Sequence, residues 1–232
     1  MIARSKAGKR ISCALKAVVI LAAVAGIRIS AEAGIGTGIY VGGSQVFMYF
    51  TIQSNLVIAL ICAVGGFLLT RNRPIPMGWY IVKLMGTVSI LLTGVVFTLV
   101  LAPALGPGAW NIQNILTHLV VPAAAVADFL LIAPGAGIRR KSVIYGVIPP
   151  MLYGLYAGIG YGLGWRFAGS LNYPYDFLNW GSPAGAFGFS HESPYMGCVW
   201  WMLVLLLFVI AAGWLLLAAA DRIGKAISAR RA

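Results

Sequence analysis

The chain has 232 residues, of which 9% are charged and 60% are hydrophobic, whereas soluble domains carry about 25% charged residues. A soluble protein of this size could not bury so much apolar surface, and a disordered chain would be poor in the aliphatic and aromatic residues that abound here. Both classes are excluded, which leaves a membrane protein that crosses the bilayer several times. The net charge of +12 would indicate nucleic-acid binding only if the basic residues fell outside a membrane topology.

Six apolar stretches are each long enough to cross a bilayer as a helix, which takes roughly 20 residues. None of them alternates between polar and apolar residues, as the strands of a membrane β-barrel do. We therefore expect an all-α integral membrane protein, a six-transmembrane-helix bundle that forms a single domain over residues 1–232. The predicted spans cover residues 11–31, 47–70, 79–101, 112–133, 143–164 and 197–220, and an aromatic outer loop covers about 165–196.

Basic residues gather on one side of this topology. Lys and Arg are enriched at the cytoplasmic ends of transmembrane helices, so we expect both termini to be cytoplasmic, and the even number of spans agrees. This placement accounts for the net charge, and we expect membrane lipids as partners and no nucleic acid. The residues concerned precede the first span or follow the second, fourth and sixth: Arg4, Lys6, Lys9, Arg10, Arg71, Arg73, Arg139, Arg140, Lys141, Arg222, Lys225, Arg230 and Arg231.

The first span has two interpretations. Its basic start, its apolar stretch and the sequence Ala31-Glu32-Ala33 resemble a cleavable signal peptide. Arg28 and Glu32, however, have the i,i+4 spacing of an ion pair at the end of a helix. We expect the span to be retained.

The sequence predicts neither a metal site nor a cofactor. Cys13, Cys62 and Cys198 lie in or beside separate spans without metal or disulfide spacing, so we interpret them as small packing residues. The two histidines, His118 and His191, do not form a metal-binding motif. We interpret His191 as a loop residue, with a catalytic part as the alternative.

Among the charged residues inside the predicted spans, a lysine of the third span and an aspartate of the fourth have opposite charges. Lys83 lies one turn past the cytoplasmic start of the third span, and Asp128 lies one turn before the cytoplasmic end of the fourth. Neighbouring antiparallel helices would bring them to the same depth, where opposite charges neutralise each other. We predict a structural ion pair, and a proton relay is the alternative.

A second polar cluster lies near the outer ends of the second and fourth spans. Thr51 and Asn55 share one helical face, and Asn114 and His118 share another. Both spans run inward, so Thr51 and His118 have the same depth. A histidine base could activate the threonine hydroxyl as a nucleophile, while Asn55 or Asn114 orients the pair or donates to an oxyanion. The alternative is hydrogen bonding that only joins helices.

The loop over about 165–196 is long and rich in aromatic residues. Loops of this length tend to be functional, so one interpretation is a lid over the bundle with Tyr173, Tyr175, Phe177 and Trp180 as substrate-gate residues. The other interpretation is an aromatic belt at the membrane interface.

Three of these segments resemble the androgen-induced membrane protein family, and the chain is similar to its bacterial six-span branch. They are residues 49–56 (Tyr-Phe-Thr-Ile-Gln-Ser-Asn-Leu), His118 followed by Pro122 and Asp128, and residues 173–178 (Tyr-Pro-Tyr-Asp-Phe-Leu). The resemblance extends over nearly all six spans in order, and it implies a bacterial inner (plasma) membrane location.

The resemblance implies an intramembrane hydrolase of lipid esters, such as fatty acid esters of hydroxy fatty acids. The threonine nucleophile of the family corresponds to Thr51, its histidine to His118, and an acidic residue farther along the same span to Asp128. Residues 51–55 are more polar here than in animal members, so the substrate preference does not transfer. The alternative functions are a non-catalytic protein that binds or transports a small hydrophobic ligand through the same polar pocket, and a purely structural bundle.

Overall fold

The computed structural model describes residues 5–33 and 43–229, and these residues form six helices that are long and apolar enough to cross a membrane. This result confirms the predicted all-α bundle and indicates an integral membrane protein. The observed spans are Lys6–Ala33, Phe50–Thr70, Met77–Trp110, Ile112–Ile132, Arg140–Gly162 and Cys198–Ala229. The third span extends nine residues past its predicted end at residue 101, because the Pro- and Gly-containing residues 102–110 continue it as α-helical and 3-10 turns. The last extends nine past residue 220, because charged and polar turns continue the helix beyond its apolar stretch.

Three spans are uninterrupted α-helices, and three are assembled from several elements. The uninterrupted helices are α1 (Lys6–Ala33), α2 (Phe50–Thr70) and α8 (Cys198–Ala229). The third span consists of α3 (Met77–Val96), η3 (Phe97–Leu101), α4 (Ala102–Leu105) and η4 (Gly106–Trp110); the fourth consists of α5 (Ile112–Ile115), η5 (Leu116–Val120) and α6 (Val121–Ile132); the fifth consists of η6 (Arg140–Val147) and α7 (Ile148–Gly162). Two short 3-10 helices, η2 (Gly43–Met48) and η7 (Asp176–Leu178), lie outside the spans.

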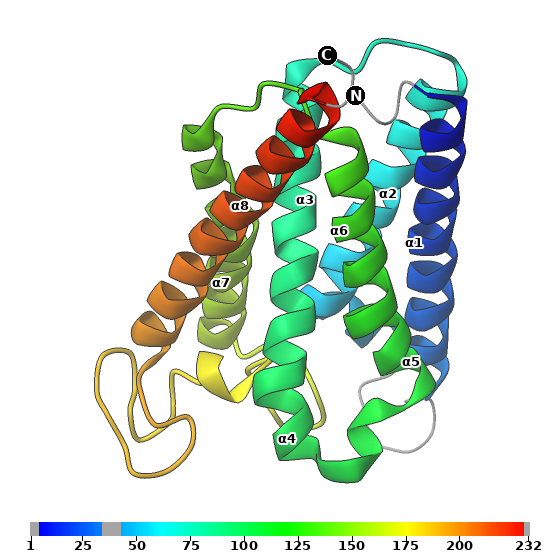
Figure 1. Cartoon of the computed structure of the whole chain (residues 1–232). Helices are drawn as coiled ribbons and strands as arrows, with labels where there is room; N and C mark the ends of the chain where they lie inside the picture. The colour runs from blue at the N-terminus through cyan, green and yellow to red at the C-terminus, as the bar shows by residue number, and fades with distance from the viewer. Residues whose placement is uncertain (1–4, 34–42, 230–232) are drawn as a thin grey trace.

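The helices α3 and α6 form the centre of the bundle (Figure 1). On one side they pack with α1 and α2 around Val19, Ile58 and Val121. On the other side they pack with α8 and η6 around Val88, Phe129 and Val209. The start of α1 and the end of α8 lie at one end of the bundle, and the long loop between α7 and α8 closes the opposite end (Figure 1).

The predicted pair of Lys83 and Asp128 is present, and a second lysine joins it. Lys83 Nζ lies 2.9 Å from Asp128 Oδ2, and Lys16 Nζ donates a hydrogen bond of 2.6 Å to Asp128 Oδ1. The same Oδ1 accepts a 2.7 Å hydrogen bond from Ser12 Oγ, and Lys83 donates to Cys62 Sγ at 3.2 Å. The three charged side chains are 0–4% exposed.

This buried charge cluster joins four helices at one depth. Ser12 and Lys16 come from α1, Cys62 from α2, Lys83 from α3 and Asp128 from α6. Charged groups inside a membrane are costly unless they are paired, so a shift of one helix along another would leave a charge without its partner. The cluster therefore fixes the positions of these helices along the bundle axis.

We predict that Asp128→Asn lowers the free energy of unfolding by about 3–5 kcal/mol, because it leaves two buried ammonium groups without a counter-charge. Lys16→Met should cost less, because one complete ion pair remains. Thermal unfolding in one detergent measures both. The matched control is Asp221→Asn, which breaks an exposed 2.9 Å pair with Arg140 and should cost about 1 kcal/mol or less. Equal unfolding temperatures for Asp128→Asn and Asp221→Asn would contradict the role of the cluster.

Candidate active site

The structure brings Thr51 and His118 together near the looped end of the bundle. Thr51 is the second residue of α2, and His118 lies in the middle of η5. The Thr51 Oγ1 atom lies 3.4 Å from His118 Nε2. General bases in structures without substrate are often at such slightly long distances from the proton they remove. The matched depth predicted from the sequence therefore corresponds to a direct side-chain contact.

The contacts of the His118 ring indicate which nitrogen carries the proton. Nδ1 lies 3.1 Å from the backbone oxygen of Asn114, which can only accept a hydrogen bond. The Thr117 hydroxyl donates its own proton to the Gln113 oxygen at 2.8 Å, so towards Nδ1, 3.0 Å away, it acts as an acceptor as well. Two acceptors around Nδ1 place the proton there. Nε2 then faces Thr51 as an unprotonated acceptor.

A stacked aromatic ring fixes the plane of His118. The Phe97 ring lies 3.8 Å from the imidazole, centroid to centroid, at an interplanar angle of 20°. Both residues lie in π-helical segments, Phe97 in η3 and His118 in η5. Such segments are uncommon and occur frequently at functional sites.

Each π-helical segment ends two residues before a proline. The N–H of Ala102 bonds to the oxygen of Phe97, and the N–H of Val121 bonds to the oxygen of Leu116; the next residues are Pro103 and Pro122. A proline has no N–H to continue the α-helical ladder, so the widened turn and the proline occur together. These two irregular turns place Phe97 and His118 face to face.

Gly94 allows the two irregular helices to approach each other. A Cβ atom at this position would lie 2.7 Å from the backbone oxygen of His118 and 3.1 Å from Pro122 Cγ. Both neighbours belong to rigid groups that cannot rotate away. The stacking of Phe97 on His118 therefore depends on a glycine one turn earlier in α3.

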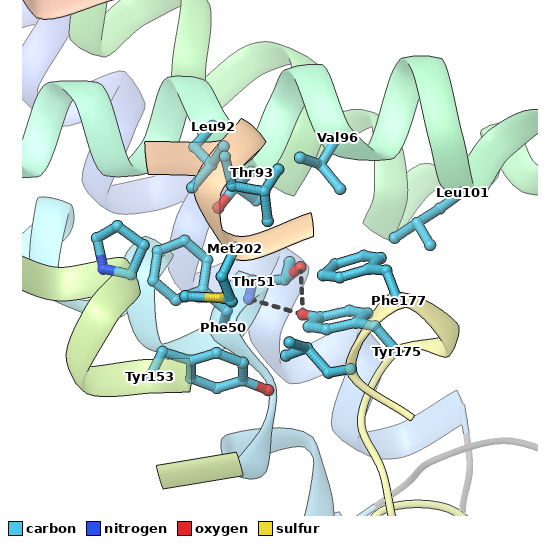
Figure 2. Close-up of a pocket in the computed structure, with 13 residues that line it drawn as sticks. Phe50, Thr51, Leu92, Thr93, Val96, Leu101, Tyr153, Tyr175, Phe177 and Met202 are labelled. Atoms are coloured by element: carbon cyan, nitrogen blue, oxygen red, sulfur yellow. Dashed lines mark hydrogen bonds between the residues drawn. The ribbon is translucent and has the colours of Figure 1, made fainter. Parts of the chain in front are cut away.

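Tyr175, from the long loop, reaches the other side of Thr51. The Thr51 N–H donates to the Tyr175 hydroxyl at 3.4 Å, and the two hydroxyl oxygens are 3.5 Å apart, as Figure 2 shows. Burial raises the pKa of the Tyr175 phenol above its usual value, so the hydroxyl keeps a proton to donate. The sequence indicates Tyr175 as a gate residue in one interpretation of the loop, but it does not predict this contact, which depends on the fold of the loop.

A cavity of about 40 Å³ opens next to Thr51, between α3, α7, α8 and the loop. Its wall is formed largely by aliphatic and aromatic side chains, including Leu92, Tyr153 and Met202, and Thr51 contributes a hydroxyl to it (Figure 2). Small-molecule sites are likewise mostly apolar with a few convergent polar groups, but they are several times larger than this cavity.

The side-chain amides of the two asparagines donate to backbone oxygens of the site. Asn55 uses its amide group to donate to the backbone oxygens of Thr51, at 2.8 Å, and Thr117, at 3.2 Å, which joins α2 to η5. The Asn114 amide donates to the oxygen of Ala109 at 2.8 Å. Asn114 contributes to the orientation of His118 through its backbone oxygen.

The four predicted gate residues divide into two groups. Tyr175 and Phe177 line the cavity and stack on each other at 5.1 Å. Trp180 packs instead against Tyr161 and over Gly158 of α7, and Tyr173 does not line the cavity. His191 is exposed in the loop and is also outside the cavity.

Within residues 5–33 and 43–229, no group of three or more His, Cys, Asp or Glu side chains is placed to hold a metal ion. No family model, no curated protein and no solved structure matches this chain. The site combines a hydroxyl, an oriented imidazole and a phenol at the edge of an apolar cavity.

We predict that Gly94→Ala lowers the free energy of unfolding by about 1–3 kcal/mol, because its methyl group overlaps the His118 carbonyl. Gly78→Ala is the matched control in the same helix, since nothing lies within 4 Å of a Cβ atom there, and it should be neutral or stabilising by about 1 kcal/mol. Thermal unfolding of both variants measures the difference. A Gly94→Ala protein as stable as Gly78→Ala would show that the close approach is not required.

Proposed function

We propose that this protein is an intramembrane hydrolase of lipid esters, with Thr51 as the nucleophile and His118 as the general base. The observation that carries the proposal is the 3.4 Å contact between Thr51 Oγ1 and an imidazole whose other nitrogen is held by the Asn114 oxygen. A base oriented by a third group is typical of an activated hydroxyl nucleophile. The resemblance to the androgen-induced membrane protein family supports the same assignment.

The proposed reaction has two halves. In the first, His118 Nε2 takes the proton of the Thr51 hydroxyl as Oγ1 attacks the ester carbonyl. The bond from the carbonyl carbon to the alcohol oxygen then breaks, the alcohol leaves with the proton from His118, and an acyl-threonine remains. In the second, His118 takes a proton from water, the resulting hydroxide attacks the acyl group, and the acid leaves as the proton returns to Thr51.

Tyr175 supplies the donor for the negative charge that develops on the carbonyl oxygen. Its hydroxyl lies next to Thr51 Oγ1, and its pKa is raised by burial, so it remains protonated when the charge develops. Donors placed in this way act strongly in a dry site. The proposed oxyanion donor thus comes from the loop, whereas helical spacing in the sequence indicates Asn55 or Asn114, which lie in the second and fourth spans.

The proposal includes an orientation in the membrane. The basic residues favour cytoplasmic termini, and the family resemblance implies a bacterial inner membrane, so Thr51 and His118 would lie near the outer surface. The substrate would then be a lipid ester of the outer leaflet.

We predict that the purified protein hydrolyses a long-chain para-nitrophenyl ester, and that Thr51→Ala and His118→Gln each reduce the rate about 100-fold or more. Thr51→Ser should keep part of the activity, because a hydroxyl remains. Tyr175→Phe should reduce the rate about 100-fold without removing the nucleophile. The control is Thr70→Ala, an exposed threonine at the far end of α2.

Two results would contradict the proposal. Full activity in Thr51→Ala would show that another group is the nucleophile. If the protein hydrolyses none of the esters tested but binds a ligand, and Thr51→Ala abolishes that binding, the alternative of a non-catalytic binding or transport protein would be favoured.

A further inference from the structure

A second and larger cavity lies beside the one at Thr51. It is a groove of about 350 Å³ between α2, α3 and α7. Val57 of α2 and Leu152 of α7 form its two edges and are among the exposed apolar residues of the bundle. In a membrane-spanning bundle, exposed apolar residues of the spans face lipid, so the groove opens sideways into the hydrocarbon of the bilayer.

The dimensions of the groove match one hydrocarbon chain. Along α2 its lining extends from Phe50 to Ile61, which at 1.5 Å per residue is roughly 16 Å. The hydrocarbon core of a bilayer is about 30 Å thick, so the groove covers the depth of about one leaflet. Its volume lies in the range of sites for small molecules.

One polar group in the groove has no partner. Ser89 lines the groove and is 4% exposed, and its Oγ has no hydrogen-bond partner among the described residues. The neighbouring hydroxyls of Ser54 and Thr93 bond to each other at 2.8 Å. A buried hydroxyl without a partner costs free energy, so the Ser89 hydroxyl is free to form a hydrogen bond with an oxygen atom of a molecule in the groove.

The groove and the Thr51 cavity share a wall. Phe50 and Tyr153 line both of them, with ring centroids 5.2 Å apart. The Tyr153 hydroxyl is held by the oxygen of Met48 at 3.1 Å, whereas Phe50 is the residue directly before Thr51. The Phe50 ring therefore stands between the groove and the cavity at the nucleophile.

The position of Ser89 relative to Thr51 follows from the two helices. The contact between Ser54 and Thr93 sets the level of α2 against α3. Ser89 lies about one turn deeper than Thr93, and Thr51 lies about one turn nearer the looped end than Ser54. The two hydroxyls are therefore roughly 10 Å apart along the bundle axis.

We propose that this groove binds one acyl chain of the lipid ester, and that Ser89 donates a hydrogen bond to an oxygen on that chain roughly 10 Å from the ester carbonyl. The substrate class is an ester whose chain bears a hydroxyl or similar oxygen near its middle. The chain enters sideways from the membrane between α2 and α7, and the ester reaches Thr51 past Phe50. The inference rests on the proposed function for the identity of the ester, and its test does not require turnover.

The first test uses photocrosslinking of a diazirine-bearing stearic acid to Thr51→Ala protein in lipid nanodiscs. Leu152→Trp should fill the groove and reduce labelling of groove-lining peptides at least fivefold. Leu155→Trp is the matched control, because Leu155 is in the same helix and is equally exposed, at 62% against 61%, but does not line the groove. Equal labelling in both tryptophan variants, or labelled peptides only from other surfaces, would overturn the inference.

The second test examines Ser89 by competition against the same probe. A stearic acid with a mid-chain hydroxyl should compete better than plain stearic acid, and Ser89→Ala should reduce that preference about 2- to 10-fold. An unchanged preference in a Ser89→Ala protein that still folds would overturn the assignment of Ser89. Since binding is measured in Thr51→Ala protein, groove labelling without any esterase activity in the unmodified protein would refute the proposed function alone.

Discussion

The carboxylate of Asp128, held between Lys16 and Lys83, is the interaction on which the arrangement of this bundle depends. In an apolar solvent there is little hydrophobic force between helices to select one depth over another, whereas an unpaired charge is strongly disfavoured. Cys62 follows Thr51 by about three turns of α2, and Asp128 follows His118 by a similar length of the fourth span. The two helices run in the same direction, so aligning one end with the charge cluster aligns Thr51 with His118 at the other.

The third and fourth spans are irregular near the looped end, whereas the residues of the charge cluster lie in regular α-helices. Two widened turns, each followed by a proline, place Phe97 against His118, and Gly94 removes the side chain that would keep them apart. The loop then adds Tyr175 to Thr51. A firmly paired end thus supports an end whose backbone departs from regular helix geometry, which is the arrangement expected of a site where side-chain orientation matters more than helix stability.

The parts of this structure that follow from periodicity and depth could be predicted from the sequence. Six apolar stretches predicted six spans, and helical spacing placed Lys83 near Asp128 and Thr51 near His118. Lys16 was missed although it too is a charge inside a predicted span, because its packing against Asp128, 112 positions away, depends on which helices are neighbours. Spacing along one helix does not predict the contact of Tyr175 with Thr51, because that contact depends on tertiary packing. The same is true of the hydrogen bonds that the Asn55 and Asn114 amides donate to backbone oxygens. The π-helical turns had a partial signal in the prolines at 103 and 122.

The measurement that most directly tests Thr51 and His118 as a catalytic pair is the position of a covalent adduct after treatment with an alkyl fluorophosphonate. Peptide mass spectrometry should find the phosphonyl group on Thr51 of the unmodified protein, and should find none on Thr51 in His118→Gln, because the hydroxyl is not nucleophilic without its base. An adduct on a different residue, or equal modification of Thr51 with and without His118, would contradict the account.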